Sequence, residues 1–235
     1  MGRLFITGDT HNSIDIGKLT TGEFREQKEL ARDDVLLIAG DFGLPWKHPE
    51  DGSDKVWLKW HENKNYTTVF VDGNHENFDA LKTYPVVSFA GAQCHQIRPH
   101  VYHVMRGEVL TLAGHKILCM GGANSTDKSS RKPHKSWWQE ERPTQEEWEH
   151  ALNNLTQQRP DIIVTHDTPY SAVAWPLEID QVRAELEHML YVIETENIPV
   201  TDWYFGHHHI DCDIQKGKII FHAIYQKHVE IPPRK

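Results

Sequence analysis

The sequence lacks the features of membrane-inserted and disulfide-stabilised proteins. No run of about 18 apolar residues occurs, so we expect no membrane span. The three cysteines, Cys94, Cys119 and Cys212, are far apart and odd in number, which argues against a disulfide framework and against a thiolate zinc site. The first residues, MGRLFITGDTHN, lack the positive-then-apolar pattern of a signal peptide, and a cytoplasmic protein is therefore expected.

An excess of positive charge is also missing. The formal net charge is −9 at pH 7, whereas affinity for nucleic acid usually comes from a surface rich in Lys and Arg. A general nucleic-acid binder is therefore disfavoured, although a local basic patch remains compatible with this charge. With 38% hydrophobic and 25% charged residues and no linker or repeat, the 235 residues are expected to form one globular domain, residues 1–235.

Three early segments share one pattern, in which a short apolar run leads to Gly-Asp or Gly-Asn and then to polar residues. The runs cover residues 4–6, 35–39 and 69–71. Continuous apolar runs of this length are typical of strands that are buried on both faces of a sheet. Helical patterns at residues 24–31 and 56–60 separate the three runs, so the order predicts a parallel α/β layer.

The rest of the chain predicts further strands, two helices and one long loop. A capping box at residues 143–147 begins a helix that Pro160 ends, and residues 182–193 form a second amphipathic stripe. Residues 123–143 are polar and are expected to form a long surface loop. Short strands are predicted at residues 101–105, 109–112 and 116–120 as an antiparallel hairpin series, at 162–164, and in a β-rich tail over 203–231.

Side chains able to bind metal follow five of the predicted strands. Alone, each signal is weak, because Gly-Asp after a strand is usually a turn and a single histidine usually packs or caps. Together, and each at a strand end, they indicate a site, because ligands of open α/β sheets bind beyond the carboxyl ends of the strands. The segments are GDTH at residues 8–11, GD at 40–41, GNHE at 73–76, THD at 165–167 and GHHH at 206–209.

The mixture of donors in these segments suits a pair of divalent cations. Two cations about 3.5–4 Å apart need a carboxylate between them and neutral donors on either side. Imidazole combined with carboxylate favours Mn, and Fe, Zn and Co also fit, whereas Mg or Ca prefers oxygen alone. The candidate donors are Asp9, His11, Asp41, Asn74, His166, His207 and His209.

The ordered set Asp-x-His, Gly-Asp, Gly-Asn-His-Glu, Thr-His and Gly-His-x-His resembles the calcineurin-like metallophosphoesterase family, in particular its small bacterial and phage members. The motifs span residues 8–209. The resemblance implies an α/β sandwich of mixed β-sheets flanked by helices. It also implies hydrolysis of phosphomonoesters or small phosphodiesters by a hydroxide held between two divalent metal ions, most readily Mn²⁺.

The resemblance also implies a role for each position. It assigns Asp9, His11 and His209 to the first metal, Asp41 to the bridge, and Asn74, His166 and His207 to the second metal. His75 would protonate the leaving group or steady the transition state. Glu76 or Asp167 would orient His75, with loop capping as the alternative for both, and His208 would not be a ligand.

The chain departs from the protein-phosphatase branch of this family at the second motif. That branch carries Gly-Asp-x-Val-Asp-Arg-Gly, whereas residues 40–46 read GDFGLPW and contain no arginine. The loop at 123–143 is the expected substrate-side insertion, because cations beside aromatic rings bind phosphate and stack on bases or sugars. The candidates there are Asn124, with Ser125 beside it, Arg131, His134 and Trp137; the alternative is a solvated loop whose tryptophans pack on the core.

Two other functions remain open at this stage. A metal-dependent nuclease would belong to the same family, but the acidic balance and the short chain count against it. A non-catalytic scaffold with the same fold is the alternative from another class, although every ligand position is filled. The expected partner is a small phosphate ester, and the sequence carries no signal for an oligomeric state.

Overall fold

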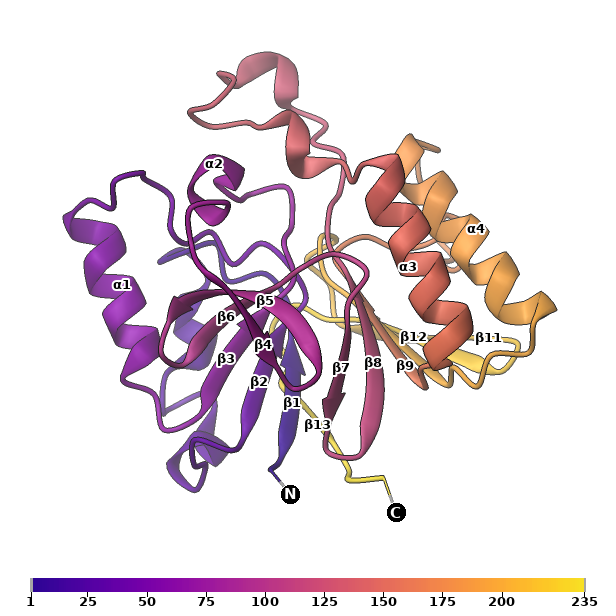
Figure 1. Ribbon diagram of the computed structural model, residues 1–235, viewed down its shortest axis with the longest axis horizontal. Helices are drawn as coiled ribbons and strands as arrows, with labels where there is room; N and C mark the ends of the chain where they lie inside the picture. The colour runs from indigo at the N-terminus through magenta and orange to yellow at the C-terminus, as the bar shows by residue number, and fades with distance from the viewer. Residues whose placement is uncertain (1, 235) are drawn as a thin grey trace.

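The computed structural model describes residues 2–234, in which two mixed sheets pack face to face (Figure 1). The seven-stranded sheet contains, in spatial order, β13 (Val229–Ile231), β1 (Leu4–Thr7), β2 (Val35–Ile38), β3 (Thr67–Phe70), β6 (Val101–Val104), β5 (Ala92–Arg98) and β4 (Val86–Phe89). The six-stranded sheet contains β11 (Cys212–Lys216), β12 (Ile219–Ala223), β10 (Asp202–Phe205), β9 (Ile162–Thr165), β8 (His115–Met120) and β7 (Val109–Leu112). The predicted fold class is thus confirmed.

Parallel strands form the centre of each sheet. In the first sheet β1, β2, β3 and β6 pair in parallel, and in the second β8, β9, β10 and β12 do so. The apolar runs LFIT, VLLI and IIVT are buried at every position, as expected for strands covered on both faces. Antiparallel strands lie at the edges.

Helices cover the outer face of each sheet, so the molecule has four layers (Figure 1). One apolar cluster, which includes Ile6, Cys119 and Val164, joins the facing sides of the two sheets. A second packs α3 (Gln145–Gln158) and α4 (Gln181–Thr195) on the second sheet. A third packs α1 (Gly52–Glu62), α2 (Phe78–Leu81) and the 3-10 turn η1 (Ile16–Leu19) on the first. No helix within residues 2–234 is both long and apolar enough to cross a membrane.

Two predicted elements differ in the structure. The helix expected at residues 24–31 is only a 3-10 turn, η2 (Arg25–Lys28). The Gln27 side chain donates to the carbonyl oxygens of Leu19 and Phe24, at 3.0 and 2.8 Å, and so holds the turn in an irregular path. The expected hairpin series at 101–120 is divided: β6 joins the first sheet, whereas β7 and β8 form a hairpin at the edge of the second.

The loop at residues 123–143 rises above the carboxyl ends of the strands and contains two 3-10 turns, η3 (Lys128–Ser130) and η4 (Gln139–Glu141) (Figure 1). It is anchored by Trp138, which is buried, packs edge-on against Trp46 and donates through Nε1 to Asp79 Oδ2 at 2.7 Å. The alternative of a tryptophan packed on the core therefore applies to Trp138.

Candidate metal centre

The five ligand-bearing segments follow β1, β2 and β3 of the first sheet and β9 and β10 of the second. These strands are neighbours within their sheets, so their carboxyl ends bring the segments to a common edge of the sandwich. Hydrogen bonds connect the two groups: His166 Nδ1 lies 2.9 Å from the carbonyl oxygen of Ala39, and the backbone N–H of His207 donates to Asp9. The centre is therefore built by both sheets.

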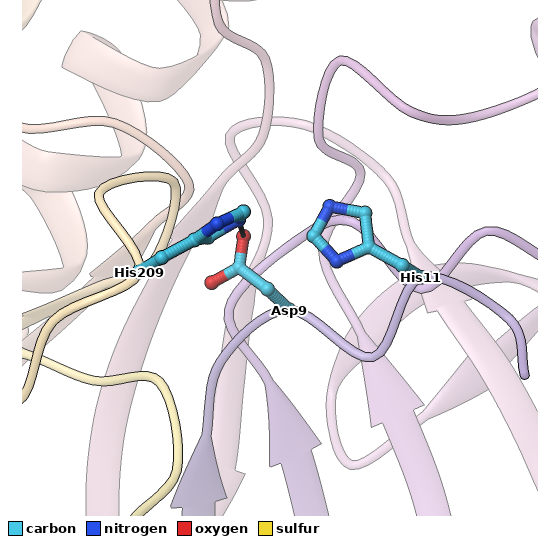
Figure 2. Close-up of side chains that lie close together, drawn as sticks. All are labelled: Asp9, His11 and His209. Atoms are coloured by element: carbon cyan, nitrogen blue, oxygen red, sulfur yellow. Dashed lines mark ion pairs between the residues drawn. The ribbon is translucent and has the colours of Figure 1, made fainter. Parts of the chain in front are cut away.

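Asp9, His11 and His209 form the first group of donors, with one ligand atom from each within 4.8 Å of the others. Figure 2 shows the carboxylate of Asp9 between the two imidazole rings. His209 Nε2 lies 3.7 Å from Asp9 Oδ1, and the ring centroids of His11 and His209 are 5.0 Å apart. The ring of Tyr225 stacks on His209 at 4.7 Å and fixes its plane.

Asp41 lies between the imidazole rings of His11 and His166. Its Oδ2 is 3.0 Å from His11 Nε2, and its Oδ1 is 3.3 Å from His166 Nε2. Asn74 Oδ1 is 3.2 Å from the same His166 nitrogen. One carboxylate therefore faces donors on two sides, which is the arrangement a bridging ligand requires.

His207 and His75 complete the arrangement. The ring of His207 packs edge-on against His166 at 5.0 Å, and His75 packs edge-on against His11 at 5.1 Å. The backbone N–H of His75 donates to Asp41 Oδ1 at 2.7 Å, which holds this residue beside the Asp41 carboxylate. The structure thus brings together all seven predicted ligand residues and His75.

The backbone of the centre is strained at several ligands. Left-handed φ angles occur at His11 (43°), Asp41 (49°), His207 (64°) and His209 (51°). Residues with a β-carbon rarely adopt this region, and such strain concentrates at functional sites because surrounding packing must maintain it.

Two glycines of the motifs are required by close approach. A β-carbon at Gly40, whose φ is +91°, would lie 2.0 Å from His166 Nδ1. A β-carbon at Gly73 would lie 2.1 Å from Asp41 Oδ1. Glycine therefore precedes these ligands because neighbouring ligands occupy the space of a side chain.

The buried carboxylates of the centre favour positive charge nearby. Burial raises the pKa of Asp9 to about 6, and the nearby carboxylate of Asp41 acts in the same direction. Burial alone would lower the pKa of His166, but Asp41 and Asp9 outweigh it and raise that pKa to about 10. Burial opposes ionisation of Asp41, yet His166 and His11 lower its pKa well below the ordinary value. Bound cations would neutralise the same carboxylates.

Outer hydrogen bonds fix which ring nitrogen of His11 and of His166 faces the centre. His11 Nδ1 contacts Asp15 Oδ2 at 2.7 Å, as His166 Nδ1 contacts a backbone carbonyl, and both rings therefore turn Nε2 inward. Asp15 was not predicted, although its position four residues after His11 was a usable signal.

A second outer contact sets the amide of Asn74. Its Nδ2 donates to Ser125 Oγ at 3.1 Å, which leaves Oδ1 toward His166. Ser125 in turn donates to the fully buried carboxylate of Glu141 through N at 2.9 Å and Oγ at 2.6 Å. Glu141 was missed, because no local pattern connects it to a motif that lies far away in sequence.

The donor set fits divalent transition-metal ions. It combines buried carboxylates, an amide oxygen and imidazole nitrogens, and the donor groups found among residues 2–234 include no cysteine. Mixed nitrogen and oxygen donors of this kind suit Mn, Fe, Zn or Co.

A pocket of about 360 Å³ opens over the centre. Of the residues proposed to bind substrate, Ser125 and Arg131 line it, and Arg131 Nη2 lies 3.0 Å from His75 Nε2. Asn124, His134 and Trp137 are not among the described residues that line it. His134 instead contacts Asp79 on the outer side of the loop, at 2.9 Å.

The sequence model of calcineurin-like phosphoesterases matches residues 2–211, most of the chain. The chain belongs to this family. The predicted resemblance is confirmed, and the family relation supports a metal-dependent hydrolase with a dinuclear divalent metal centre. Among curated proteins, no significant match was found.

Solved structures share the calcineurin-like fold at low sequence identity. GAP50, the anchor in the inner membrane complex of Plasmodium, aligns with a TM-score of 0.55 and 13% identity over 95% of this chain and 71% of its own. A candidate 5′-nucleotidase of Staphylococcus aureus, in complex with alpha-ketoglutarate, aligns with a TM-score of 0.51 and 11% identity over 95% of this chain and 48% of its own. Phosphopantetheinyl hydrolase from Mycobacterium tuberculosis aligns with a TM-score of 0.45 and 16% identity over 95% of this chain and 89% of its own.

Of the two roles considered for Glu76 and Asp167, the hydrogen bonds favour loop capping, and those found among residues 2–234 join neither carboxylate to His75. Glu76 accepts the backbone N–H groups of Phe42 and Gly43, at 2.8 and 3.0 Å. Asp167 binds His208 Nε2 at 3.1 Å and Arg183 Nε at 2.9 Å. Both carboxylates hold loops of the family's motifs, the alternative role considered for them.

Proposed function

We propose that this chain hydrolyses phosphate esters, either monoesters or small diesters, with the help of two divalent cations. The observation that carries the proposal is the convergence of buried carboxylates and imidazoles from both sheets around Asp41. Family membership supports the same chemistry.

The proposed ligands divide into two sets that share Asp41. Asp9, His11 and His209 would hold one ion and Asn74, His166 and His207 the other, with Mn²⁺ as the expected metal. When bound, such ions lower the pKa of water and neutralise charge on phosphate oxygens.

His75 is proposed to act on the leaving group. Its ring lines the pocket beside Asp41, where it would pass a proton or hydrogen bond to the leaving oxygen. A positioned acid of this kind contributes about 10²–10⁴-fold to rate.

The test separates metal binding from proton transfer. Asp41→Asn should lose bound Mn²⁺ and hydrolysis of an aryl phosphate and its diester, because the shared ligand loses its charge. His75→Asn should retain Mn²⁺ but slow turnover by about 10²–10⁴-fold. Elemental analysis and steady-state kinetics measure both effects.

The same experiment distinguishes the alternatives. Full activity of metal-stripped Asp41→Asn would refute the proposal, and wild-type protein that binds little metal would favour a scaffold. Cleavage of labelled single-stranded or duplex DNA with Mn²⁺, in preference to small esters, would favour a nuclease.

A further inference from the structure

The loop at residues 123–143 directs one arginine into the pocket over the metal centre. Arg131 Nη2 lies 3.0 Å from His75 Nε2 and Nη1 lies 3.4 Å from His75 Nδ1. The side chain is only 14% exposed, although it belongs to a loop that projects from the body of the molecule (Figure 1). Arg131 is therefore directed toward the proposed catalytic residue instead of solvent.

The position of this guanidinium is fixed from its own loop. Arg131 Nε donates to Asp127 Oδ2 at 2.9 Å, and Asp127 also lines the pocket. The contact restrains the stem side of the guanidinium, while both terminal nitrogens contact His75, a residue that lines the pocket, and Nη1 also donates to the carbonyl oxygen of Ser136 at 3.5 Å. Because the stem is held in place, less side-chain entropy is lost when the fork binds a ligand.

No other arginine or lysine among the described residues lines this pocket. The second motif, residues 40–46, contains no cation, so among the described residues that line the pocket the fixed positive charge comes from the loop alone. The pocket volume of about 360 Å³ accommodates a phosphoryl group with a small organic substituent.

We propose that Arg131 binds the phosphoryl group of the substrate and makes the site selective for phosphate monoesters over diesters. This inference rests on the proposed phosphoesterase function. A guanidinium binds two phosphate oxygens through parallel N–H groups, an arrangement that lysine cannot reproduce. A phosphate monoester has three non-bridging oxygens and carries up to two negative charges. A phosphate diester has two non-bridging oxygens and carries one negative charge. A guanidinium beside His75 is therefore attracted more strongly to the monoester than to the diester.

The experiment compares Arg131 with its neighbour in the loop. Lys132 is exposed and does not line the pocket, so Lys132→Gln removes the same charge one residue away. Steady-state kinetics with Mn²⁺ would use 4-nitrophenyl phosphate and bis(4-nitrophenyl) phosphate as substrates. Arg131→Gln should lower kcat/KM for the monoester by about 10–100-fold, mainly through KM, and change the value for the diester by less than about threefold.

A binding measurement provides a readout that does not depend on turnover. Titration calorimetry with inorganic phosphate should show affinity reduced at least about tenfold in Arg131→Gln and unchanged in Lys132→Gln. Arg131→Lys should fall between wild type and Arg131→Gln, because it keeps the charge but loses the fork.

Several results would overturn the inference. Equal losses for monoester and diester would mean that Arg131 only supports the pocket, and wild-type kinetics and phosphate affinity in Arg131→Gln would mean that it takes no part. If wild-type protein hydrolyses neither ester, the proposed function fails, whereas the phosphate titration still decides whether Arg131 binds the phosphoryl group. Arg131→Lys provides the comparison if Arg131→Gln folds poorly.

Discussion

His61 is a histidine that does not belong to the metal centre and is fully buried. Its ring lies edge-on to Phe42 at 4.8 Å, and neither ring nitrogen has a hydrogen-bond partner within residues 2–234. Burial lowers its pKa to about 3, because a charged imidazole loses its hydration there, and the cation of Lys64 acts in the same direction. The folded protein therefore keeps this ring neutral.

The pH dependence of stability follows from this difference. Below the ordinary pKa of about 6.5, the unfolded state binds a proton that the folded state does not, so the free energy of unfolding falls by about 1.4 kcal/mol per pH unit until about pH 3. Above about pH 6.5 the residue has no effect. His61→Phe should remove this part of the slope, as measured by urea unfolding of metal-free protein between pH 4 and 7.

Tyr66→Phe provides the control, because the Tyr66 hydroxyl is also buried and its pKa is raised by burial, away from the acidic range. That variant should keep the wild-type slope. Identical slopes in wild type and His61→Phe would contradict the assignment.

For single residues, the sequence predicted the proposed metal ligands better than the residues that hold those ligands by hydrogen bonds. Asp9, Asp41 and His166 follow apolar runs that form strands, so their convergence could be inferred from strand order. Glu141 lies in a polar loop, and its contact with Ser125 depends on how that loop folds back. Glu76 accepts the backbone N–H groups of Phe42 and Gly43, a contact that its position beside His75 in the sequence did not reveal.

Among the structural elements, the loop at 123–143 is connected to the candidate metal centre by hydrogen bonds. Its two ends are joined by a hydrogen bond from the N–H of Ala123 to the carbonyl of Glu141, at 3.1 Å. Glu141 holds Ser125, and Ser125 holds the amide of Asn74. The base of the loop therefore belongs to the support of the proposed second metal site.

Ser125→Ala should weaken metal binding. Without the hydroxyl, the amide of Asn74 can rotate and present its NH₂ group to the centre, and loss of such an outer contact typically costs about 10–100-fold in metal affinity. Ser129→Ala is the matched control, because Ser129 is exposed in the same loop. Competition with a fluorescent chelator measures Mn²⁺ affinity; equal affinities in the two variants would refute this role.

Strands were predictable wherever an apolar run was continuous, and they were missed at the edge of the first sheet. β4 and β5 escaped prediction because polar residues interrupt their apolar pattern, at Ser88 in β4 and at Gln93, His95 and Gln96 in β5. The division of residues 101–120 between two sheets could not be inferred, since pairing of β6 with β3 and of β8 with β9 is decided by non-local packing.

For the whole molecule, the centre links the two sheets. Metal ions held by ligands from both sheets should stabilise the sandwich, because they bind only the folded state. At an ion concentration 100 times the dissociation constant the gain is about 2.7 kcal/mol, which corresponds to an increase in Tm of about 5–10 °C. Thermal unfolding with Mn²⁺ and with a chelator measures the difference.

Asp41→Asn should lose most of this difference, whereas Ser129→Ala should keep it. Amide hydrogen exchange should become faster after chelation at the carboxyl ends of β1 and β2 and of β9 and β10 together. Faster exchange in one sheet alone would contradict the linkage.

The separation of the ligands along the chain also has a consequence for biosynthesis. Asp9 and His207, which are in contact in the folded protein, are 198 residues apart. At roughly 5–20 residues per second of translation, on the order of 10–40 s pass between the synthesis of one and of the other. Throughout that interval the nascent chain lacks His207 and His209, so the complete centre can acquire its metal ions only after residue 209 has been synthesised.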